Sequence, residues 1–220
     1  PNIMSIHDIG LTDQGQPYFT MDYISGESLG DIFRQLAKGD ESYQQKYPLA
    51  ILLNIFQKIC DAIAYAHSRQ VIHLDLKPDN INVGSFGDVC VYDWGLAKVI
   101  NGANSDVLGS DDELDGEILN DVTILGYVKG TPGYLAPEQI GNDTEKGFYT
   151  DVYELGGILY TLLTGKAPVN AASMDELIMQ TLAGNIAEPI ILAPQKAIPL
   201  SLNAVCMKAL SCEPLQRYTS

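Results

Sequence analysis

The chain has 220 residues, of which 46% are hydrophobic and 19% are charged, so its composition excludes a disordered segment and a small disulfide-stapled scaffold. Its 28 acidic residues outnumber its 13 basic residues and give a net charge of −15, which disfavours nucleic acids and anionic membrane surfaces as partners. No apolar run reaches the roughly 18 residues of a membrane span and no secretory signal is visible, so we expect no membrane segment.

Hydrophobic patterning in the first part of the sequence predicts a hairpin followed by a long helix. Strand-like runs at residues 3–9 and 18–24 flank a turn-forming segment that contains Gly15. Between residues 49 and 67, apolar residues recur every three or four positions, which is the pattern of an amphipathic helix. Pro48 stands at the start of this helix, where its missing N–H costs nothing.

The middle of the sequence predicts a second hairpin and then a long acidic stretch. Short β-branched runs at residues 80–83 and 88–92 are joined by a turn bounded by glycines. Residues 99–129 show no sustained period, and we assign them no structure. Their acidic part, residues 106–121, is either a solvated loop or a docking segment for a basic partner.

The last part of the sequence predicts helices. Residues 150–164 are apolar almost all round, which is typical of a helix at the centre of a domain, and Gly165 supplies its C-terminal stop. Two further helices are predicted at residues 173–183 and 200–210, with a proline-rich segment at 189–199 between them. The chain is therefore predicted to be mostly helical, with about four or five short strands in its first half.

The residues that suggest chemistry lie in one loop, residues 73–80, between the long helix and the second hairpin. Folding that hairpin returns Asp93 to the neighbourhood of Asn80, so that a carboxylate and an amide oxygen converge. Oxygen ligands of this kind suit Mg²⁺ held against a nucleotide. Asp75 would then be free to accept a proton from a hydroxyl, and Lys77 to neutralise charge on a transferring phosphoryl group.

With these residues the sequence resembles the eukaryotic-type (Hanks-type) serine/threonine protein kinase family, in a bacterial-like form. The family's H-R-D-L-K-P-x-N loop matches residues 73–80, its D-F-G matches residues 93–95, and its A-P-E matches residues 136–138. Residues 151–156 are similar to the family's D-x-W-S-x-G helix start, and residues 213–217 to its C-terminal D-P-x-x-R. The resemblance covers essentially the whole chain.

The resemblance implies an α+β, protein-kinase-like fold with a mostly helical large lobe, short β-hairpins and a small lobe that is largely missing. Residues 1–24 would form the end of the small lobe and the hinge. Residues 25–220 would form the large lobe, with an activation segment at 93–138. No glycine-rich loop, strand lysine or helix glutamate precedes Met21, so we expect the sequence to be a fragment of a longer protein.

The resemblance also implies roles in catalysis and in cofactor binding. Asp75 would be the catalytic base, Lys77 would contact the γ-phosphate and favour serine and threonine over tyrosine, and Asn80 would complete this catalytic set. The metal ligands for Mg²⁺ would be Asn80 and Asp93. The residues implied in binding ATP combine the hinge with the loop and the second hairpin: Met21, Asp22, Ile24, Lys77, Asn80, Asn82 and Asp93.

Other residues are implied in substrate docking and in holding the fold. Thr131 would lie in the loop that receives the substrate. Glu138 and Arg217 would form a buried ion pair. Asp151 would cap backbone N–H groups of the catalytic loop, and His73 is interpreted as a packed, hydrogen-bonded core histidine.

Three residues depart from the family pattern. Leu74 replaces the arginine that normally pairs with an activation-loop phosphate, which makes the chain non-RD and predicts activity without phosphorylation of Thr123 or Thr131. Trp94 replaces phenylalanine and keeps a large apolar ring beside the metal-binding carboxylate. Asn82 places an amide where the family usually has an apolar residue under the adenine ring.

The sequence thus predicts the catalytic domain of a Mg-ATP-dependent protein serine/threonine kinase, whose partners are a nucleotide and a protein substrate with a serine or threonine acceptor. The 220 residues alone are expected to transfer phosphate poorly. The alternative is a pseudokinase or scaffold, which Leu74, Asn82 and the missing small lobe favour. Cysteines without C-x-x-C spacing are typical of a reducing compartment, so we expect a cytoplasmic domain.

Overall fold

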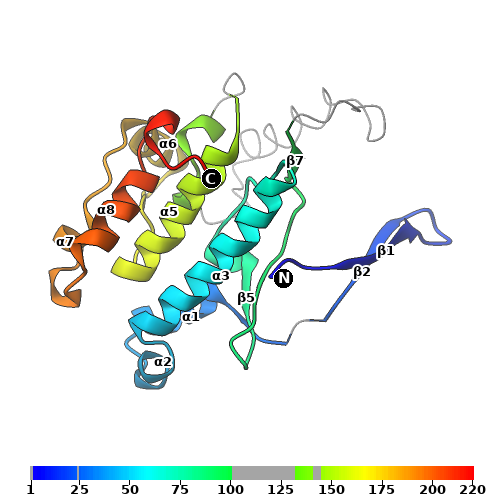
Figure 1. The fold of residues 1–220 in the computed structure, drawn as a ribbon, viewed down its shortest axis with the longest axis horizontal. Coiled ribbons are helices and arrows are strands. Elements are labelled where there is room, and N and C mark those ends of the chain that lie inside the picture. Colours follow the sequence, from blue (N-terminus) through cyan, green and yellow to red (C-terminus); the bar gives the residue numbers. More distant parts are fainter. Residues whose placement is uncertain (1, 24, 101–131, 141–144) are drawn as a thin grey trace.

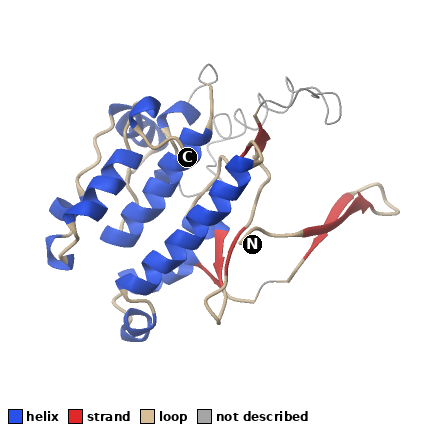
Figure 2. Cartoon of the chain, in the orientation of Figure 1, coloured by secondary structure: helices blue, strands red, loops and turns tan. Residues whose placement is uncertain are grey.

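The computed structural model describes residues 2–23, 25–100, 132–140 and 145–220, which form a helical body beside three small sheets (Figures 1 and 2). The acidic stretch 106–121, Ile24 and Thr131, for which the sequence made predictions, lie outside the described residues.

The predicted N-terminal hairpin is confirmed. Strands β1 (Ile6–Leu11) and β2 (Pro17–Met21) pair antiparallel, with Leu11 opposite Pro17 next to the turn. Nearly all of their side chains are exposed, and the hairpin extends away from the helices (Figure 1).

The second predicted hairpin is also confirmed, and it supplies two strands of a three-stranded sheet. Strands β5 (Ile81–Val83) and β6 (Val89–Val91) pair antiparallel, and β3 (Glu27–Ser28) pairs with the other edge of β5. A separate pair joins β4 (Val71–Ile72) to β7 (Lys98–Val99). The described residues therefore contain seven strands rather than the four or five expected, because two-residue strands carry too little alternation to be seen in a sequence.

The four predicted helices are confirmed, and three short helices were not predicted. The α-helices of the described residues are α1 (Leu29–Ala37), α2 (Glu41–Lys46), α3 (Leu49–Ser68), α5 (Phe148–Thr164), α6 (Met174–Ala183), α7 (Pro189–Leu192) and α8 (Leu200–Ala209). Single 3₁₀ turns are η1 (Pro78–Asn80), η2 (Pro132–Tyr134), η3 (Pro137–Gln139), η4 (Pro194–Lys196) and η5 (Pro214–Gln216). The unpredicted helices are α1, α2 and α7. The first two begin at side-chain caps, Ser28 and Asp40, whose oxygens accept first-turn N–H groups.

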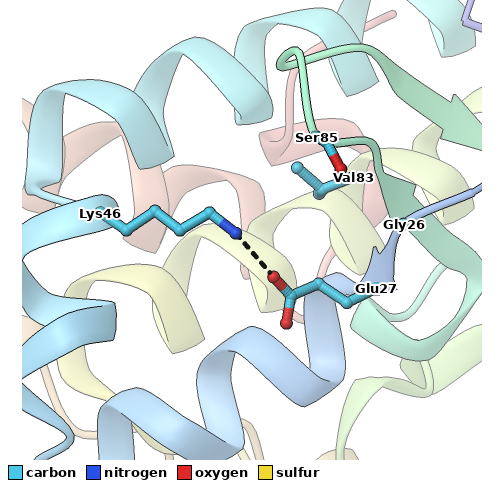
Figure 3. Close-up of a pocket in the computed structure, with 5 residues that line it drawn as sticks. All are labelled: Gly26, Glu27, Lys46, Val83 and Ser85. Atoms are coloured by element: carbon cyan, nitrogen blue, oxygen red, sulfur yellow. Dashed lines mark hydrogen bonds and ion pairs between the residues drawn. The ribbon is translucent and has the colours of Figure 1, made fainter.

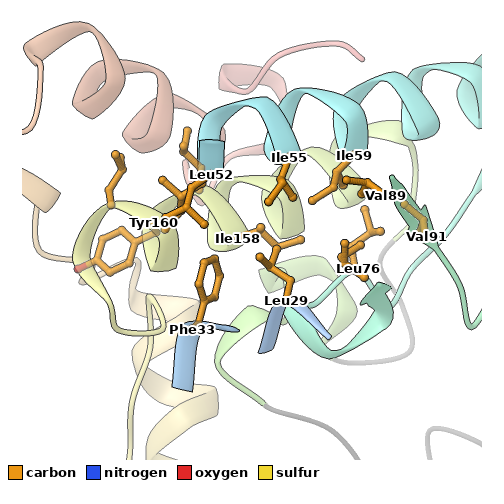
Figure 4. Close-up of a cluster of buried hydrophobic side chains, with 14 of the residues drawn as sticks. Leu29, Phe33, Leu52, Ile55, Ile59, Leu76, Val89, Val91, Ile158 and Tyr160 are labelled. Atoms are coloured by element: carbon orange, nitrogen blue, oxygen red, sulfur yellow. The ribbon is translucent and has the colours of Figure 1, made fainter. Parts of the chain in front are cut away.

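Two helices build the core. Helix α5 is buried almost all round, as its sequence predicted, and ends at Gly165, which adopts the left-handed conformation with φ +84°. Helix α3 packs one face against α5 and β6, and Figure 4 shows its Leu52, Ile55 and Ile59 lying beside Ile158 of α5. In length and composition α3 is the one helix of the described residues that could cross a membrane, but its apolar face is a core face here.

A buried ion pair fastens the end of the described chain to the body. The guanidinium of Arg217 donates to Glu138 through Nη1–Oε1 (2.6 Å) and Nη2–Oε2 (2.9 Å), the bidentate geometry that favours arginine. Both residues are only 4% exposed. Arg217 also donates to the carbonyl oxygens of Tyr149, Ser211 and Cys212. The structure therefore contains the pair that the resemblance implied, and it connects η3, η5 and the start of α5.

Replacing Arg217 with Met should lower the free energy of unfolding by about 3–5 kcal/mol, because the Glu138 carboxylate would remain buried without its partner. The double variant Glu138→Gln with Arg217→Met should lose less than the sum of the two single losses, since neither charge is then stranded. Denaturant unfolding of the natural protein and the three variants measures both effects. A single-variant loss below about 1 kcal/mol would mean that the pair behaves like a surface salt bridge.

Candidate active site

The loop between β4 and β5 alternates buried and outward-facing side chains. Leu74 and Leu76 are 6% and 1% exposed, and Leu76 belongs to the main hydrophobic core (Figure 4). Asp75 and Lys77 face outward, with side chains 27% and 14% exposed. Leu74 has φ +67°, a conformation uncommon for a leucine. The loop is thus anchored by its apolar residues and leaves its charged residues partly open to solvent.

Asp75, Lys77 and Asn80 form one hydrogen-bonded cluster. Lys77 Nζ lies 2.6 Å from Asp75 Oδ2, and Asn80 Nδ2 donates to the same oxygen at 2.9 Å and to the Asp75 carbonyl at 2.8 Å. Asn80 is 4% exposed and lies in η1, whose proline at the first position favours the turn. The structure therefore brings the three predicted catalytic residues together.

The second hairpin carries Asp93 back towards Asn80. Tyr92 N donates to the Asn80 carbonyl (3.1 Å), so Asp93 directly follows a residue bonded to Asn80. Asp93 is exposed and has φ +63°. The Nδ2 group of Asn80 donates both of its hydrogen bonds to Asp75. The other amide atom, Oδ1, is therefore the one that could bind a cation.

The donor set at this place fits Mg²⁺ in its chemistry, since an amide oxygen and a carboxylate are hard ligands. The described residues contain no cluster of three or more His, Cys, Asp or Glu side chains suited to a metal ion. A cation held by Asn80 and Asp93 would therefore take its other oxygen ligands from phosphate and water.

His73 and Trp94 pack together behind the cluster. Their ring centroids lie 4.5 Å apart, and Trp94 Nε1 donates to the Val91 carbonyl (3.2 Å), a bond that the phenylalanine of the family pattern has no atom to make. His73 is 0% exposed; its Nδ1 accepts the Asp75 N–H (3.2 Å) and its Nε2 lies 3.3 Å from the Tyr92 carbonyl. Burial lowers the pKa of His73, which keeps Nδ1 available as an acceptor. His73 is thus a packed core histidine.

Two carboxyl groups of α5 hold the backbone of the loop from inside. Asp151 is 0% exposed and accepts the N–H of His73 (2.9 and 3.1 Å) and of Leu74 (2.9 Å). Glu154, one turn further along the helix, accepts the N–H of Leu76 (2.8 Å). The first of these contacts was implied by the resemblance. The contact of Glu154 was not predicted. An acidic residue in an almost wholly apolar helix does indicate a buried polar contact, because acidic residues are seldom buried without partners.

Two other contacts of this region were missed. His67, near the end of α3, places Nε2 2.8 Å from Asp151 Oδ2. Gln139 of η3 accepts the Ala136 N–H (2.7 Å) and donates to the Leu74 carbonyl (2.8 Å). The sequence offered no sign of the contact between His67 and Asp151 or of that between Gln139 and Leu74, because each joins segments far apart in the chain.

The residues predicted to meet the nucleotide are only partly described. Met21 ends β2 and is 47% exposed, and Asp22 lies 2.8 Å from His7 Nε2 in a surface pair. In the described part of the chain, neither side chain is bonded to the loop that carries Asp75. The predictions for Ile24 and Thr131 cannot be compared with described positions.

Asn82 lies in β5, opposite Ser28 of β3. Its Oδ1 is buried and has no hydrogen-bond partner among the residues that the structure describes. A Cβ placed on Gly26 would lie 2.6 Å from this oxygen, so Gly26 allows the amide to pack against the chain that follows the predicted hinge. An unpaired buried oxygen costs stability, which is the price of an amide at this position.

A cavity of about 250 Å³ lies beside the same strands, but it is not the predicted catalytic cluster. It is lined by Gly26, Glu27, Lys46, Val83 and Ser85 (Figure 3). The carboxylate of Glu27 accepts from Tyr43 (2.6 Å), Tyr47 (2.9 Å) and Lys46 (3.1 Å). These bonds tie α2 to β3, so we interpret the cavity as a by-product of that packing.

Fold and site together define a protein kinase domain, and the family model described as protein kinase domain matches residues 1–220. The chain therefore belongs to the protein kinase family, and the α+β kinase-like fold predicted from the sequence is confirmed.

Three similar proteins, each named serine/threonine-protein kinase PknD, are matched over the whole of this chain. They come from Chlamydia caviae (34% identical), Protochlamydia amoebophila (36%) and Chlamydia trachomatis serovar D (35%). The chain spans 23–24% of the length of these relatives.

The free energy of unfolding of Glu154→Gln, relative to that of the natural protein, should increase as pH rises from about 5 to about 8. Burial, followed by the nearby charge of Asp151, raises the pKa of Glu154 well above its ordinary value of 4.5. The folded protein then keeps a proton that the unfolded chain releases above pH 4.5, so this group's contribution to stability is present below that pH and is lost as pH rises through the folded-state pKa. Glutamine does not titrate.

Denaturant unfolding of both proteins at the two ends of this pH range measures the difference. A difference in the free energy of unfolding that stays constant, or that moves against glutamine, would contradict a raised pKa for Glu154.

Proposed function

We propose that this chain is the catalytic domain of a Mg-ATP-dependent protein kinase that transfers the γ-phosphoryl group of ATP to serine or threonine hydroxyls. The observation that carries the proposal is the cluster of Asp75, Lys77 and Asn80, with Asp93 returned beside it by the β5–β6 hairpin. The printed names of the relatives, which are serine/threonine-protein kinases, support the same activity.

Each residue of the cluster has a role that its geometry supports. The Asp75 carboxylate accepts the proton of the attacking hydroxyl, while the hydroxyl oxygen forms the new bond to phosphorus and the bond to the leaving ADP oxygen breaks. Lys77 holds its ammonium within 2.6 Å of Asp75 and is placed to neutralise charge on the transferring group. Asn80 and Asp93 would hold Mg²⁺, which supplies positive charge next to the phosphate oxygens.

The remaining assignments belong to the same proposal. Residues 1–24 would be the end of a small lobe and the hinge, with Met21, Asp22 and Ile24 contacting adenine, and residues 25–220 the large lobe. The activation segment would run from 93 to 138, with Thr131 in the substrate loop. Asn82 would lie under the adenine ring.

The partners that follow are ATP and a protein with an exposed serine or threonine. We also propose a cytoplasmic location for this domain, because the four cysteines are free thiols, which fits a reducing compartment.

A second candidate function, a pseudokinase or scaffold, is favoured by two observations. The buried Oδ1 of Asn82 has no partner in the described residues, which weakens an apolar adenine site. Leu74, which stands in place of the family's arginine, is buried and cannot pair with a phosphate.

Asp93→Asn in the full-length protein distinguishes these functions. We expect phosphoryl transfer to a serine- or threonine-containing peptide to fall by about a hundredfold or more, because one metal ligand loses its charge. Asp88→Asn, the same change at an exposed position of the hairpin that precedes Asp93, is the matched control and should retain activity. Radiolabel transfer from ATP measures the rates. No transfer by the natural protein, with its fold intact, would favour the scaffold.

Thr123→Ala should leave phosphoryl transfer by the full-length protein unchanged. Activation by phosphate needs arginines to receive it, and all three arginines of the chain have other contacts: Arg34 pairs with Asp31 and Asp79, Arg69 lies over Tyr65, and Arg217 pairs with Glu138. Initial rates of the two proteins, after phosphatase treatment, measure the effect. Loss of activity in Thr123→Ala, restored by Thr123→Glu, would contradict this account.

A further inference from the structure

Four consecutive backbone N–H groups of the catalytic loop all donate to side chains inside the protein. His73 N and Leu74 N donate to Asp151, and Asp75 N donates to the His73 ring. The fourth, Leu76 N, donates to Glu154 Oε2 at 2.8 Å. Because every amide of this stretch has a fixed acceptor, the path of the loop is set by its surroundings.

The contact made by Glu154 lies between the two charged residues of the loop. Leu76 lies between Asp75 and Lys77, so the direction of its N–H bond is coupled to the orientation of both neighbouring residues. Leu76 is 1% exposed and Glu154 is 2% exposed, so bulk water does not reach this amide in the folded protein. Glu154 is the only hydrogen-bond acceptor that the described residues give to the Leu76 N–H.

The carbonyl side of the loop is held as well. Gln139 donates to the Leu74 carbonyl and Asn80 donates to the Asp75 carbonyl, both at 2.8 Å. Leu74 is held at φ +67°, where a leucine is strained. A strained loop persists only where neighbouring groups over-determine it, and Glu154 is one of the few such groups.

The position of Glu154 is a departure from the family's D-x-W-S-x-G pattern, in which serine stands at this place. The side-chain oxygens of glutamate lie two bonds further from the backbone than the serine hydroxyl. Glu154 therefore reaches the Leu76 amide from α5, one turn beyond Asp151. The two carboxyl groups thus act on adjacent parts of the loop from one helix face.

We propose that Glu154 is a positioning residue, which fixes the backbone of Leu76 and thereby the placement of Asp75 and Lys77 for phosphoryl transfer. The effect of Glu154 on the reaction rests on the proposed kinase function. The hydrogen bond by which Glu154 fixes the loop does not depend on that function. Removal of the acceptor leaves the Leu76 N–H buried and unpaired, and the loop relaxes to find water or another acceptor.

Three variants of the full-length protein test this. Glu154→Ala removes the acceptor, whereas Glu154→Gln keeps an oxygen in the same place and should restore most of the activity lost in the alanine variant. Thr164→Ala is the matched structural control, because Thr164 is also buried on α5 and loses side-chain bonds to Tyr160 and Lys166 at the far end of the helix.

Steady-state kinetics and amide hydrogen exchange are the two measurements. We expect kcat of Glu154→Ala to fall by roughly tenfold to a hundredfold with little change in KM for ATP, since a small misplacement of reacting groups has effects of this size. The Leu76 amide should exchange faster in Glu154→Ala only. Thr164→Ala should lower the melting temperature without either change.

The outcomes separate this inference from the proposed function. Two results together would overturn the inference. The first is that Glu154→Ala and Thr164→Ala, compared at the same loss of melting temperature, lose kcat to the same extent. The second is that the Leu76 amide exchanges at an unaltered rate in Glu154→Ala. If the natural protein transfers no phosphate, the proposed function fails, and hydrogen exchange at Leu76 alone then decides whether Glu154 holds the loop.

Discussion

The carboxylate of Asp151 is the constraint on which the rest of the site depends. It is wholly buried at the start of α5, accepts two backbone N–H groups from the catalytic loop and lies 2.8 Å from the ring of His67 at the end of α3. A carboxylate so deep in a protein is tolerated only where donors surround it. The loop therefore takes its shape from the packing of two core helices, and it can adopt a conformation that its own sequence would not favour.

Within this loop, different residues anchor the backbone and carry the reactive groups. Leu74 and Leu76 point inward and are fixed by apolar packing and by Glu154, whereas Asp75 and Lys77 point outward next to Asn80. A rigid support beneath reactive side chains is what a proton-accepting carboxylate requires, because its distance from the substrate hydroxyl decides the rate.

Sequence reasoning reached the long elements and the cluster, and it missed contacts that depend on tertiary structure. The apolar period of α3 and the almost wholly apolar α5 were predictable because buried helix faces require apolar residues at regular spacing. Helix α2 was not, since none of its six residues is buried and it has no apolar period. Helix α1 does carry the helical spacing in Leu29, Ile32, Phe33 and Leu36 after the cap Ser28, so its sequence held a signal that the prediction missed. The motif residues were predictable by resemblance. The bond from the Leu76 N–H to Glu154 joins residues 78 positions apart, so no local pattern identifies its two partners. The bond from Trp94 to Val91 spans only three residues, but it depends on how the chain turns after β6, which the sequence does not show.

The most direct test of the central claim is phosphoamino acid analysis after the full-length protein has been incubated with γ-labelled ATP, Mg²⁺ and a peptide library. The account predicts label on serine and threonine, and its loss when Asp75 is replaced by Asn, because the proton acceptor is then removed. Label on tyrosine alone, or label that persists undiminished in Asp75→Asn, would contradict it.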